Sequence, residues 1–240
     1  MNIRKGLRKG WVVGMLLGSV FLIEEVQARD FKGRLGIGAS GGISILTQDI
    51  EKDIRKQKEA IVRARLLYGL TDASSAGPLN PLIEFFFLGS GHRLHSTLVG
   101  LDLEWEKYNI EGRAGSLNYG KATTLSILPF AQLRIGGFEA VSPYFLLGAG
   151  LHLNSFAESA NFNVLCLPLP GCSISPKHSV AVKIGGGADY FISPNIALNL
   201  ETAWKWNAYE TRAKGIPAGV KMDRFRMSNI SFTTGLSYYF

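Results

Sequence analysis

Apolar residues recur at every second position over most of this chain, and this period of two constrains its fold more than any other feature. It is clearest at the C-terminal end, where apolar or aromatic side chains fall on even positions: Ile230, Phe232, Leu236, Tyr238 and Phe240. Alternation of this length marks a β-strand with one apolar and one polar face. We predict strands at residues 31–46, 81–88, 94–108, 122–136, 143–155, 178–192, 195–208 and 226–240.

The connections between these segments alternate between long and short. Long connections are expected near residues 47–80, 109–121, 156–177 and 209–225, and short ones at 89–93, 137–142 and 193–194. A tilted strand needs about 9–11 residues to cross a bilayer, and most of the predicted strands reach that length. The predicted fold class is therefore all-β: an eight-stranded antiparallel transmembrane up-and-down β-barrel with short periplasmic turns and long extracellular loops.

A second candidate for the second strand lies earlier in the chain. Ile61 to Leu70 also alternates, with Arg63 and Arg65 on one face. Counting this segment together with 81–88 would give nine strands and break the alternation of long and short connections. We therefore expect 81–88 to be the strand and 47–80 to be a long first loop. Within this loop, the stretch from Asp49 to about Ala64 is predicted to form a short amphipathic helix.

The polar face of the strands tells a membrane barrel from a soluble one. A soluble barrel points apolar residues inward, whereas a membrane barrel points them toward lipid and keeps a polar lumen. Charges of both signs nearly balance on the polar face, and Trp105, Trp204, Trp206, Tyr190, Tyr238 and Phe240 lie near the strand ends, as interfacial aromatic girdles do. The membrane barrel is favoured. Its candidate lumen charge network comprises Lys32, Arg34, Glu84, Asp102, Glu104, Arg134, Lys183, Asp189, Glu201 and Lys205.

The N-terminus has the three parts of a cleaved secretory signal peptide. A basic segment precedes 13 apolar residues (WVVGMLLGSVFLI), and Val26-Gln27-Ala28 forms a small-residue cleavage site. Spanning a membrane as a helix takes about 20 apolar residues, so an N-terminal anchor is the weaker interpretation. We expect residues 1–28 to be removed and 29–240 to form the barrel. Removal lowers the formal net charge from +7 to +5, a surplus too modest to indicate nucleic-acid binding.

Composition and cysteine spacing exclude other fold classes and argue against a metal or cofactor site. The chain is 46% hydrophobic and 11% aromatic, which excludes disorder, and its 28 glycines argue against a helical array. Cys166 and Cys172 are separated by five residues, and in an oxidising compartment such a pair is a candidate disulfide. A metal site there would need further ligands nearby, and none stands at ligand spacing. We expect no cofactor, since no phosphate loop, zinc motif or dinucleotide fingerprint occurs.

Three segments resemble those of small bacterial outer-membrane barrels. The ending GLSYYF is similar to the family's C-terminal signal, with Leu236, Tyr238 and the terminal Phe240 at alternate positions. The segments PYFLLGAG from Pro143 and GGGADYFISPNIAL from Gly185 resemble strands of the OmpW-like and OmpA-like barrels. The resemblance implies location in the bacterial outer membrane, contact with outer-membrane lipid and lipopolysaccharide, and recognition of the C-terminal signal by the barrel-assembly machinery.

Three functions follow as hypotheses. The OmpW-like resemblance implies a narrow channel for small hydrophobic molecules. A barrel that does not conduct but stabilises the envelope belongs to the same hypothesis. The inward apolar residues Leu128, Phe130, Leu146 and Phe191 would line such a passage, or they pack the barrel interior, which is the commoner case. The alternative is an adhesin or immune-evasion protein whose long loops bind host surface molecules.

An outer-membrane lipid-modifying enzyme is the third and weakest hypothesis. Such an enzyme needs a serine, a histidine and a carboxylate that converge. His95-Ser96 lies near a short turn, and His178-Ser179 has no acidic residue close in sequence. We therefore expect a protein that is not an enzyme.

Overall fold

The computed structural model describes most of the chain after the predicted signal peptide. The described residues are 31–47, 58–71, 94–111, 118–135, 140–160, 173–207, 211–214 and 228–240. The predicted signal peptide, Glu84, Cys166 and Cys172 lie outside these ranges, so the expectations placed on them are not addressed by the structure.

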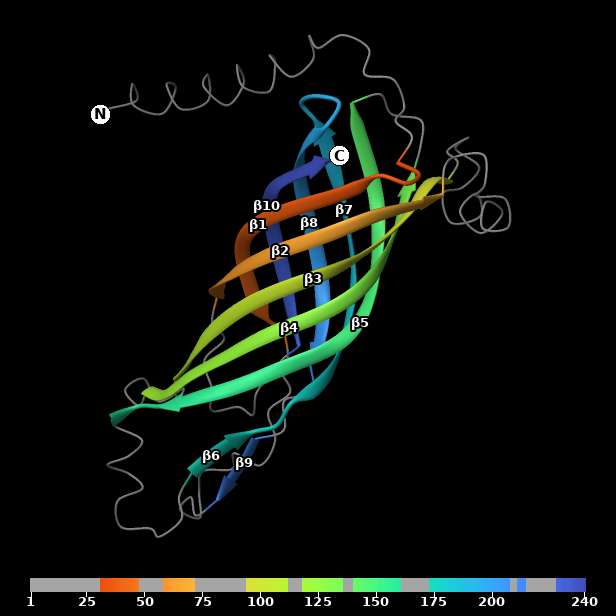
Figure 1. The fold of residues 1–240 in the computed structure, drawn as a ribbon. Coiled ribbons are helices and arrows are strands. Elements are labelled where there is room, and N and C mark those ends of the chain that lie inside the picture. Colours follow the sequence, from red (N-terminus) through yellow and green to blue (C-terminus); the bar gives the residue numbers. More distant parts are fainter. Residues whose placement is uncertain are drawn as a thin grey trace, which may run out of the picture.

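Eight antiparallel strands close into a single barrel, which confirms the predicted fold class (Figure 1). The strands are β1 (Leu35–Leu46), β2 (Lys58–Thr71), β3 (Leu94–Glu111), β4 (Asn118–Ile135), β5 (Val141–Glu158), β7 (Ser179–Phe191), β8 (Ile196–Asn207) and β10 (Asn229–Tyr239). Each pairs with its neighbour in sequence among these eight, and β1 pairs with β10 to close the ring. Closure leaves no free edge, as a sheet surrounded by lipid requires.

The two ends of the barrel differ. Residues 136–140 and 192–195 connect strands at one end, which we call the turn end and where Phe240 also lies. At the other end, the loop end, β6 (Ser173–Pro176) and β9 (Thr211–Lys214) form a separate two-stranded sheet (Figure 1). β3, β4 and β5 have 18 residues each, against 12 in β1 and 11 in β10, so this side of the wall extends farther.

The second strand differs from the sequence-based expectation. β2 occupies Lys58–Thr71, inside the segment expected to be a loop with an amphipathic helix, and it pairs with both β1 and β3. The alternation of Val62, Ala64 and Leu66 with Arg63 and Arg65 suits a strand, because the apolar side chains face outward and the arginines face the lumen. The connection from β1 to β2 is therefore 47–57. β3 follows at Leu94, and the strand expected at 81–88 and the short turn expected at 89–93 lie outside the described residues.

The outer wall of the barrel is apolar, as a lipid-facing wall must be. Leu147 is 61% exposed, Leu236 54% and Leu66 49%, whereas the charged residues of the same strands point inward and are buried. On β5 the outward apolar row runs from Phe145 to Leu153, and eight steps along a strand tilted by about 40° rise roughly 21 Å, close to the height of an outer-membrane apolar band. Within the described residues, no helix is long and apolar enough to cross a membrane.

Aromatic side chains mark both edges of this wall. Trp105 and Trp204 are exposed toward the loop end, and Tyr238 and Phe240 are exposed toward the turn end. The rings of Tyr238 and Phe240 meet edge to face, with their centroids 5.0 Å apart. Leu236, Tyr238 and Phe240, the residues of the predicted assembly signal, thus form one outward row at the end of β10.

Candidate functional site: the filled lumen

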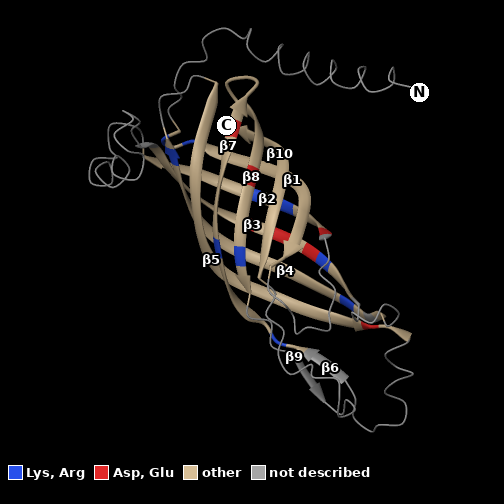
Figure 2. Cartoon of the chain, turned by 180° about the vertical axis from the view of Figure 1, so that it is seen from behind, with Lys and Arg blue, Asp and Glu red and all other residues tan. Residues whose placement is uncertain are grey.

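Four cations and four carboxylates meet in the middle of the lumen and form its central charge network. Figure 2 marks the charged positions along the barrel strands in blue and red. The eight residues are Arg63 and Arg65 of β2, Asp102, Glu104 and Glu106 of β3, Lys183 of β7, and Glu201 and Lys205 of β8. In the closed ring, β2 stands three strands from β8, and β3 stands three strands from β7. The network therefore joins opposite walls of the barrel across the lumen.

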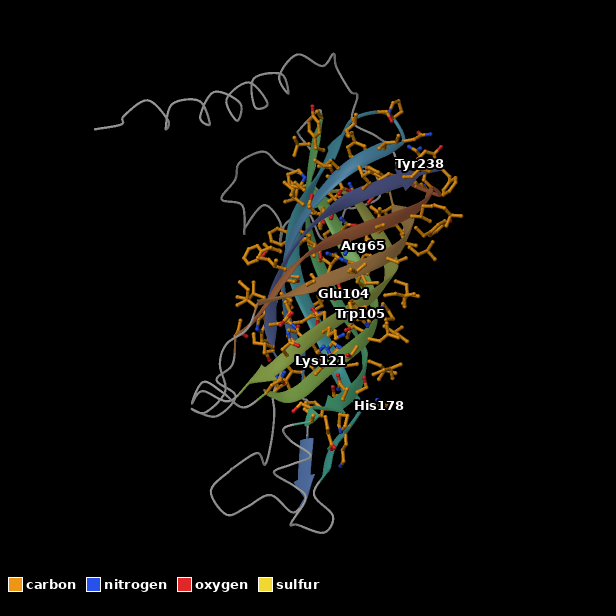
Figure 3. The ribbon with its side chains drawn as sticks, turned by 90° about the vertical axis from the view of Figure 1, so that its left-hand side faces the viewer. Arg65, Glu104, Trp105, Lys121, His178 and Tyr238 are labelled. Carbon is orange, nitrogen blue, oxygen red and sulfur yellow. The ribbon has the colours of Figure 1, made fainter. Side chains whose placement is uncertain are left out.

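Lys183 is the hub of this network. Its Nζ lies 2.8 Å from Asp102 Oδ2, 2.6 Å from Glu104 Oε1 and 2.9 Å from Glu201 Oε1. Arg65 completes the same crossing, because its Nε lies 2.6 Å from Asp102 Oδ1 and its Nη2 lies 2.8 Å from Glu201 Oε2. Asp102, Glu104 and Glu201 are thus each shared between cations of different strands (Arg65 and Glu104 are labelled in Figure 3).

The two remaining cations extend the network toward the loop end and toward β10. Lys205 Nζ lies 2.7 Å from Glu104 Oε2 and 2.8 Å from Glu106 Oε1. Arg63 binds Glu201 through Nη1 and donates a further hydrogen bond to the Thr233 hydroxyl. All eight residues are buried. Buried charges are tolerated only when they are paired, and equal numbers of both signs leave the described network with no net formal charge.

A second ionic cluster lies nearer the turn end. Arg134 of β4 pairs with Asp189 of β7, and it also donates to Ser142 Oγ at 3.1 Å and Tyr239 Oη at 2.6 Å. Asn199 bridges Asp189 and Tyr144 with its amide nitrogen, 2.6 Å from each acceptor. The Tyr144 hydroxyl in turn donates to Glu201 Oε2 at 3.0 Å, so this cluster is continuous with the central charge network.

Apolar side chains close the turn end of the lumen around this cluster. The buried hydrophobic cluster comprises Phe31, Leu67, Leu98, Phe130, Tyr144, Leu146, Phe191, Ala197 and Tyr239. Phe130, Leu146 and Phe191 belong to it, and Leu128 is fully buried as well. The inward apolar residues therefore pack the barrel interior, and Phe130 also carries the Arg65 guanidinium 4.7 Å above its ring.

Polar pairs fill the lumen toward the loop end. Ser126 Oγ lies 2.7 Å from His152 Nδ1, and Thr124 donates to Asn154 at 2.9 Å one row farther along the same two strands. Ser126 and His152 are buried and face the lumen, away from the lipid-facing wall. Among the described residues, His152 Nε2 has no hydrogen-bond partner, so no carboxylate completes a catalytic triad there.

The structure brings together seven residues of the predicted lumen network. Asp102, Glu104, Lys183, Glu201 and Lys205 lie in the central charge network, and Arg134 and Asp189 form the second cluster. Lys32 and Arg34 do not face the lumen interior. Lys32 lies in an exposed turn before β1, and the Arg34 guanidinium binds the Phe240 carbonyl at 2.9 Å and the Asn195 side chain at 2.9 Å at the turn end.

Sequence reasoning did not place Arg63 and Arg65 in the lumen network, although their alternation was visible. A useful signal is the charge balance of the other described inward residues at this level. Without β2, the four carboxylates of Asp102, Glu104, Glu106 and Glu201 have two cations, Lys183 and Lys205, as partners. Two further cations are needed for neutrality, and β2 supplies them. Among the described residues, no group of three His, Cys, Asp or Glu side chains is arranged to hold a metal ion.

A closed antiparallel barrel with an apolar outer wall and a buried ionic lumen defines a class of protein. The chain is a small eight-stranded β-barrel of the bacterial outer membrane, as the sequence predicted. The fold is similar to that of the outer membrane protein OprG from Pseudomonas aeruginosa, with a TM-score of 0.56 and 14% identity, over 87% of this chain and 96% of that one.

The fold is also similar to that of Neisserial surface protein A (NspA), with a TM-score of 0.52 and 12% identity, over 87% of this chain and 100% of that one. At such low identity the likeness concerns the fold alone. No protein-family profile matches the chain, and no curated protein sequence matches it.

Proposed function

We propose that the protein is a closed, non-conducting barrel that anchors an extracellular β-structure in the outer membrane and presents it to other surface molecules. The observation that carries this proposal is the central charge network, which joins β2 and β3 to β7 and β8 across the lumen. The interior of an eight-stranded barrel is just wide enough to be filled by side chains. Here charged side chains fill its middle, and the hydrophobic cluster fills its turn end.

A permeating ion would have to displace these groups from one another. Each cation of the network contacts at least two carboxylates, so displacement of one side chain leaves several buried charges without partners. A small apolar molecule meets the same obstacle in the middle of the lumen. The packing thus favours an anchoring and envelope-stabilising barrel over a channel for hydrophobic molecules.

The loop end offers the surface for interaction. β3, β4 and β5 have 18 residues each, several more than the roughly 11 that cross a bilayer, and the β6–β9 sheet lies beyond the same end (Figure 1). Binding residues concentrate on segments that a rigid scaffold holds in place. The long strands and the closed barrel supply such a scaffold, which supports an interaction role for the segments 159–178 and 208–228.

A catalytic role has less support. The Ser126–His152 pair is sealed inside the barrel, where a lipid substrate in the membrane does not reach it. We therefore propose that the protein binds rather than modifies its partners.

Conductance measurements test the closed lumen. The purified barrel in planar bilayers is expected to give no single-channel steps, while an open porin in the same apparatus gives regular steps. Reproducible steps from the unaltered protein, absent from a mock purification, would contradict the closed lumen.

The interaction role needs a separate experiment. Bacteria displaying the full protein are expected to adhere to cultured epithelial cells, and replacing 159–178 and 208–228 with short Gly/Ser turns should abolish adhesion. The matched control carries the same turn in place of 136–140 at the opposite end. Equal adhesion of the full and loop-replaced barrels, or none by either, would overturn this role.

A further inference from the structure

Phe31 precedes the first strand, and yet it is one of the most deeply buried residues of the barrel. It lies four positions before Leu35, where β1 begins, and only 2% of its surface is exposed. Its ring centroid lies 5.2 Å from that of Tyr239 and 5.7 Å from that of Phe191. The Arg134 guanidinium lies over the same ring, 4.4 Å from its centroid. Phe31 therefore enters the mouth of the lumen at the turn end.

The walls of this site are fixed by contacts that do not involve Phe31. Arg134 is held by Asp189, Ser142 and the Tyr239 hydroxyl. Phe191 and Tyr239 belong to strands of the closed ring, and their own rings lie 5.9 Å apart. A guanidinium over an aromatic face, beside two further rings, is the chemistry that binds an aromatic group.

A tight turn holds Phe31 in this position. Arg34 N donates to the Phe31 carbonyl at 3.0 Å, and Gly33 has a φ of +75°, which glycine adopts readily at the third position of a type II turn. Gly33 N also donates to the Gly69 carbonyl at 2.9 Å. A Cβ placed on Gly69 would overlap the Phe31 carbonyl oxygen, so the wall of β2 accepts the turn only because residue 69 is a glycine.

The same turn is fastened to the seam between β1 and β10. Arg34 donates through Nε to the Phe240 carbonyl at 2.9 Å and through Nη2 to the Tyr239 carbonyl at 3.1 Å. Phe240 N donates to the Leu35 carbonyl at 2.8 Å. The segment that carries Phe31 is thus bonded to β2 on one side and to the end of β10 on the other.

We propose that the turn end of the lumen contains a binding pocket for an aromatic group, and that the chain's own Phe31 occupies it as a plug. The pocket is formed by Arg134, Phe191 and Tyr239, and the turn from Phe31 to Arg34 keeps the plug seated. Removal of the ring opens the pocket to solvent at the turn end. An external aromatic group of similar size then takes its place, because the Arg134 guanidinium and the rings of Phe191 and Tyr239 stay in position to contact it.

Thiol accessibility tests this proposal. Ala197 is fully buried in the same hydrophobic cluster and pairs with Phe191 across β7 and β8. In a Cys166→Ser, Cys172→Ser background, Ala197→Cys is expected to react slowly with a water-soluble methanethiosulfonate. Adding Phe31→Ala should raise the modification rate at least tenfold. Millimolar N-acetylphenylalanine amide should restore protection, while the leucine amide, which has no ring to stack on Arg134, should restore much less.

Two further variants test whether the cysteine becomes exposed because the plug is displaced or because the barrel loses structure. Gly69→Ala retains Phe31 but displaces its carbonyl, so it should expose the same cysteine. Phe145→Ala removes a ring from the lipid-facing wall near the same end, where 50% of Phe145 is exposed, and should leave the rate unchanged. Folding of each variant is checked by its heat-modifiable gel mobility, and Phe31→Leu replaces Phe31→Ala if the latter does not fold.

The outcomes decide the proposal in either direction. Equal rates with and without Phe31 would show that the ring does not close the pocket. Equal protection by the phenylalanine and leucine amides would show that the pocket has no aromatic preference. None of these variants alters the central charge network, so the plug can fail while the lumen remains closed to ions.

Discussion

Arg65 on β2 lies directly opposite Asp102 on β3, and its guanidinium binds both carboxylate oxygens, through Nε at 2.6 Å and Nη2 at 2.8 Å. This bidentate geometry is the strongest form of a side-chain ion pair. The same Nη2 also lies 2.8 Å from Glu201 on the far wall. Arg65 therefore joins its neighbour on β3 to Glu201 on the opposite wall. This contact braces the barrel across the lumen.

Loss of the hub cation should destabilise the barrel strongly. Lys183→Met keeps the length of the side chain but leaves Asp102, Glu104 and Glu201 short of a shared partner. Removing one member of a buried ionic group costs about 3–5 kcal/mol. Urea unfolding in lipid vesicles measures the free energy. Lys121→Met, an exposed lysine near the loop end of β4, serves as the control and should change stability by less than about 0.5 kcal/mol. Equal losses from both variants would contradict the bracing role.

Arg65 and Asp102 should show strong energetic coupling. Arg65→Met strands a buried carboxylate, and Asp102→Leu strands a buried guanidinium, so each single change is costly. The double variant removes both charges, and its loss should be smaller than the sum of the single losses by about 1–3 kcal/mol. The same unfolding assay completes the double-mutant cycle. The matched cycle pairs Arg65→Met with Ser155→Ala on the outer wall of β5, for which additivity is expected. Strict additivity of Arg65 and Asp102 would mean that their contact contributes no specific stability.

The sequence predicts a residue's side of the barrel wall, lipid or lumen, where apolar and polar residues alternate along one strand. Period two along β5, β8 and β10 separates the lipid-facing from the lumen-facing residues, and the balance of inward charges indicates a filled lumen. From the sequence alone, residues 47–80 are expected to be a loop because a strand there, counted together with 81–88, would break the alternation of long and short connections, and because Lys52, Arg55, Lys56 and Lys58 indicate an amphipathic helix. The groups that make the arginines acceptable inside a barrel lie on β3 and β8, far along the chain.

The burial of Phe31 is a second feature that the local sequence pattern does not predict. It is one aromatic residue before an alternating segment, and it resembles the first residue of a strand. Its burial depends on Gly33, on Gly69 of another strand, and on Arg134, Phe191 and Tyr239 of three more. Contacts that are spread over four strands, β2, β4, β7 and β10, leave no periodic signal near residue 31, so only the assembled barrel reveals them.

A charge placed on the outer wall should show where lipid lies. Leu147 of β5 is 61% exposed and lies within the outward apolar row between Phe145 and Leu153. Leu147→Arg should destabilise the barrel in vesicles by about 2–4 kcal/mol, the cost of an arginine near the bilayer midplane. Ser155→Arg, two positions beyond Leu153 on the same face, should cost at most about 1 kcal/mol. A larger loss at residue 155 than at residue 147 would refute this placement of the membrane.

Two lysines stand just past the loop-end edge of this wall and should bind lipopolysaccharide phosphates. On the outward face of β3, Lys107 follows Trp105 by two positions, and Lys121 lies diagonally across from it on β4, opposite Asn109. Within the described ranges, no carboxylate forms an ion pair with either lysine, and the nearby Glu59 carboxylate accepts a hydrogen bond from Asn109 at 3.1 Å. Two like charges set diagonally on one face repel each other unless an anion lies between them.

The double variant Lys107→Gln, Lys121→Gln should therefore lose affinity for lipopolysaccharide in mixed vesicles, by about 1 kcal/mol for each lysine at low salt. Native mass spectrometry or a shift in thermal unfolding on adding lipopolysaccharide measures the loss, and raising the salt concentration should reduce the difference because it screens exposed charges. Lys32→Gln, at the turn end, is the control and should bind as the parent does, since we expect the turn end to face the periplasmic leaflet, which contains no lipopolysaccharide. Lys107→Arg with Lys121→Arg should retain binding. If the glutamine variant binds as tightly as the parent, the charge of these two lysines does not recognise the phosphates.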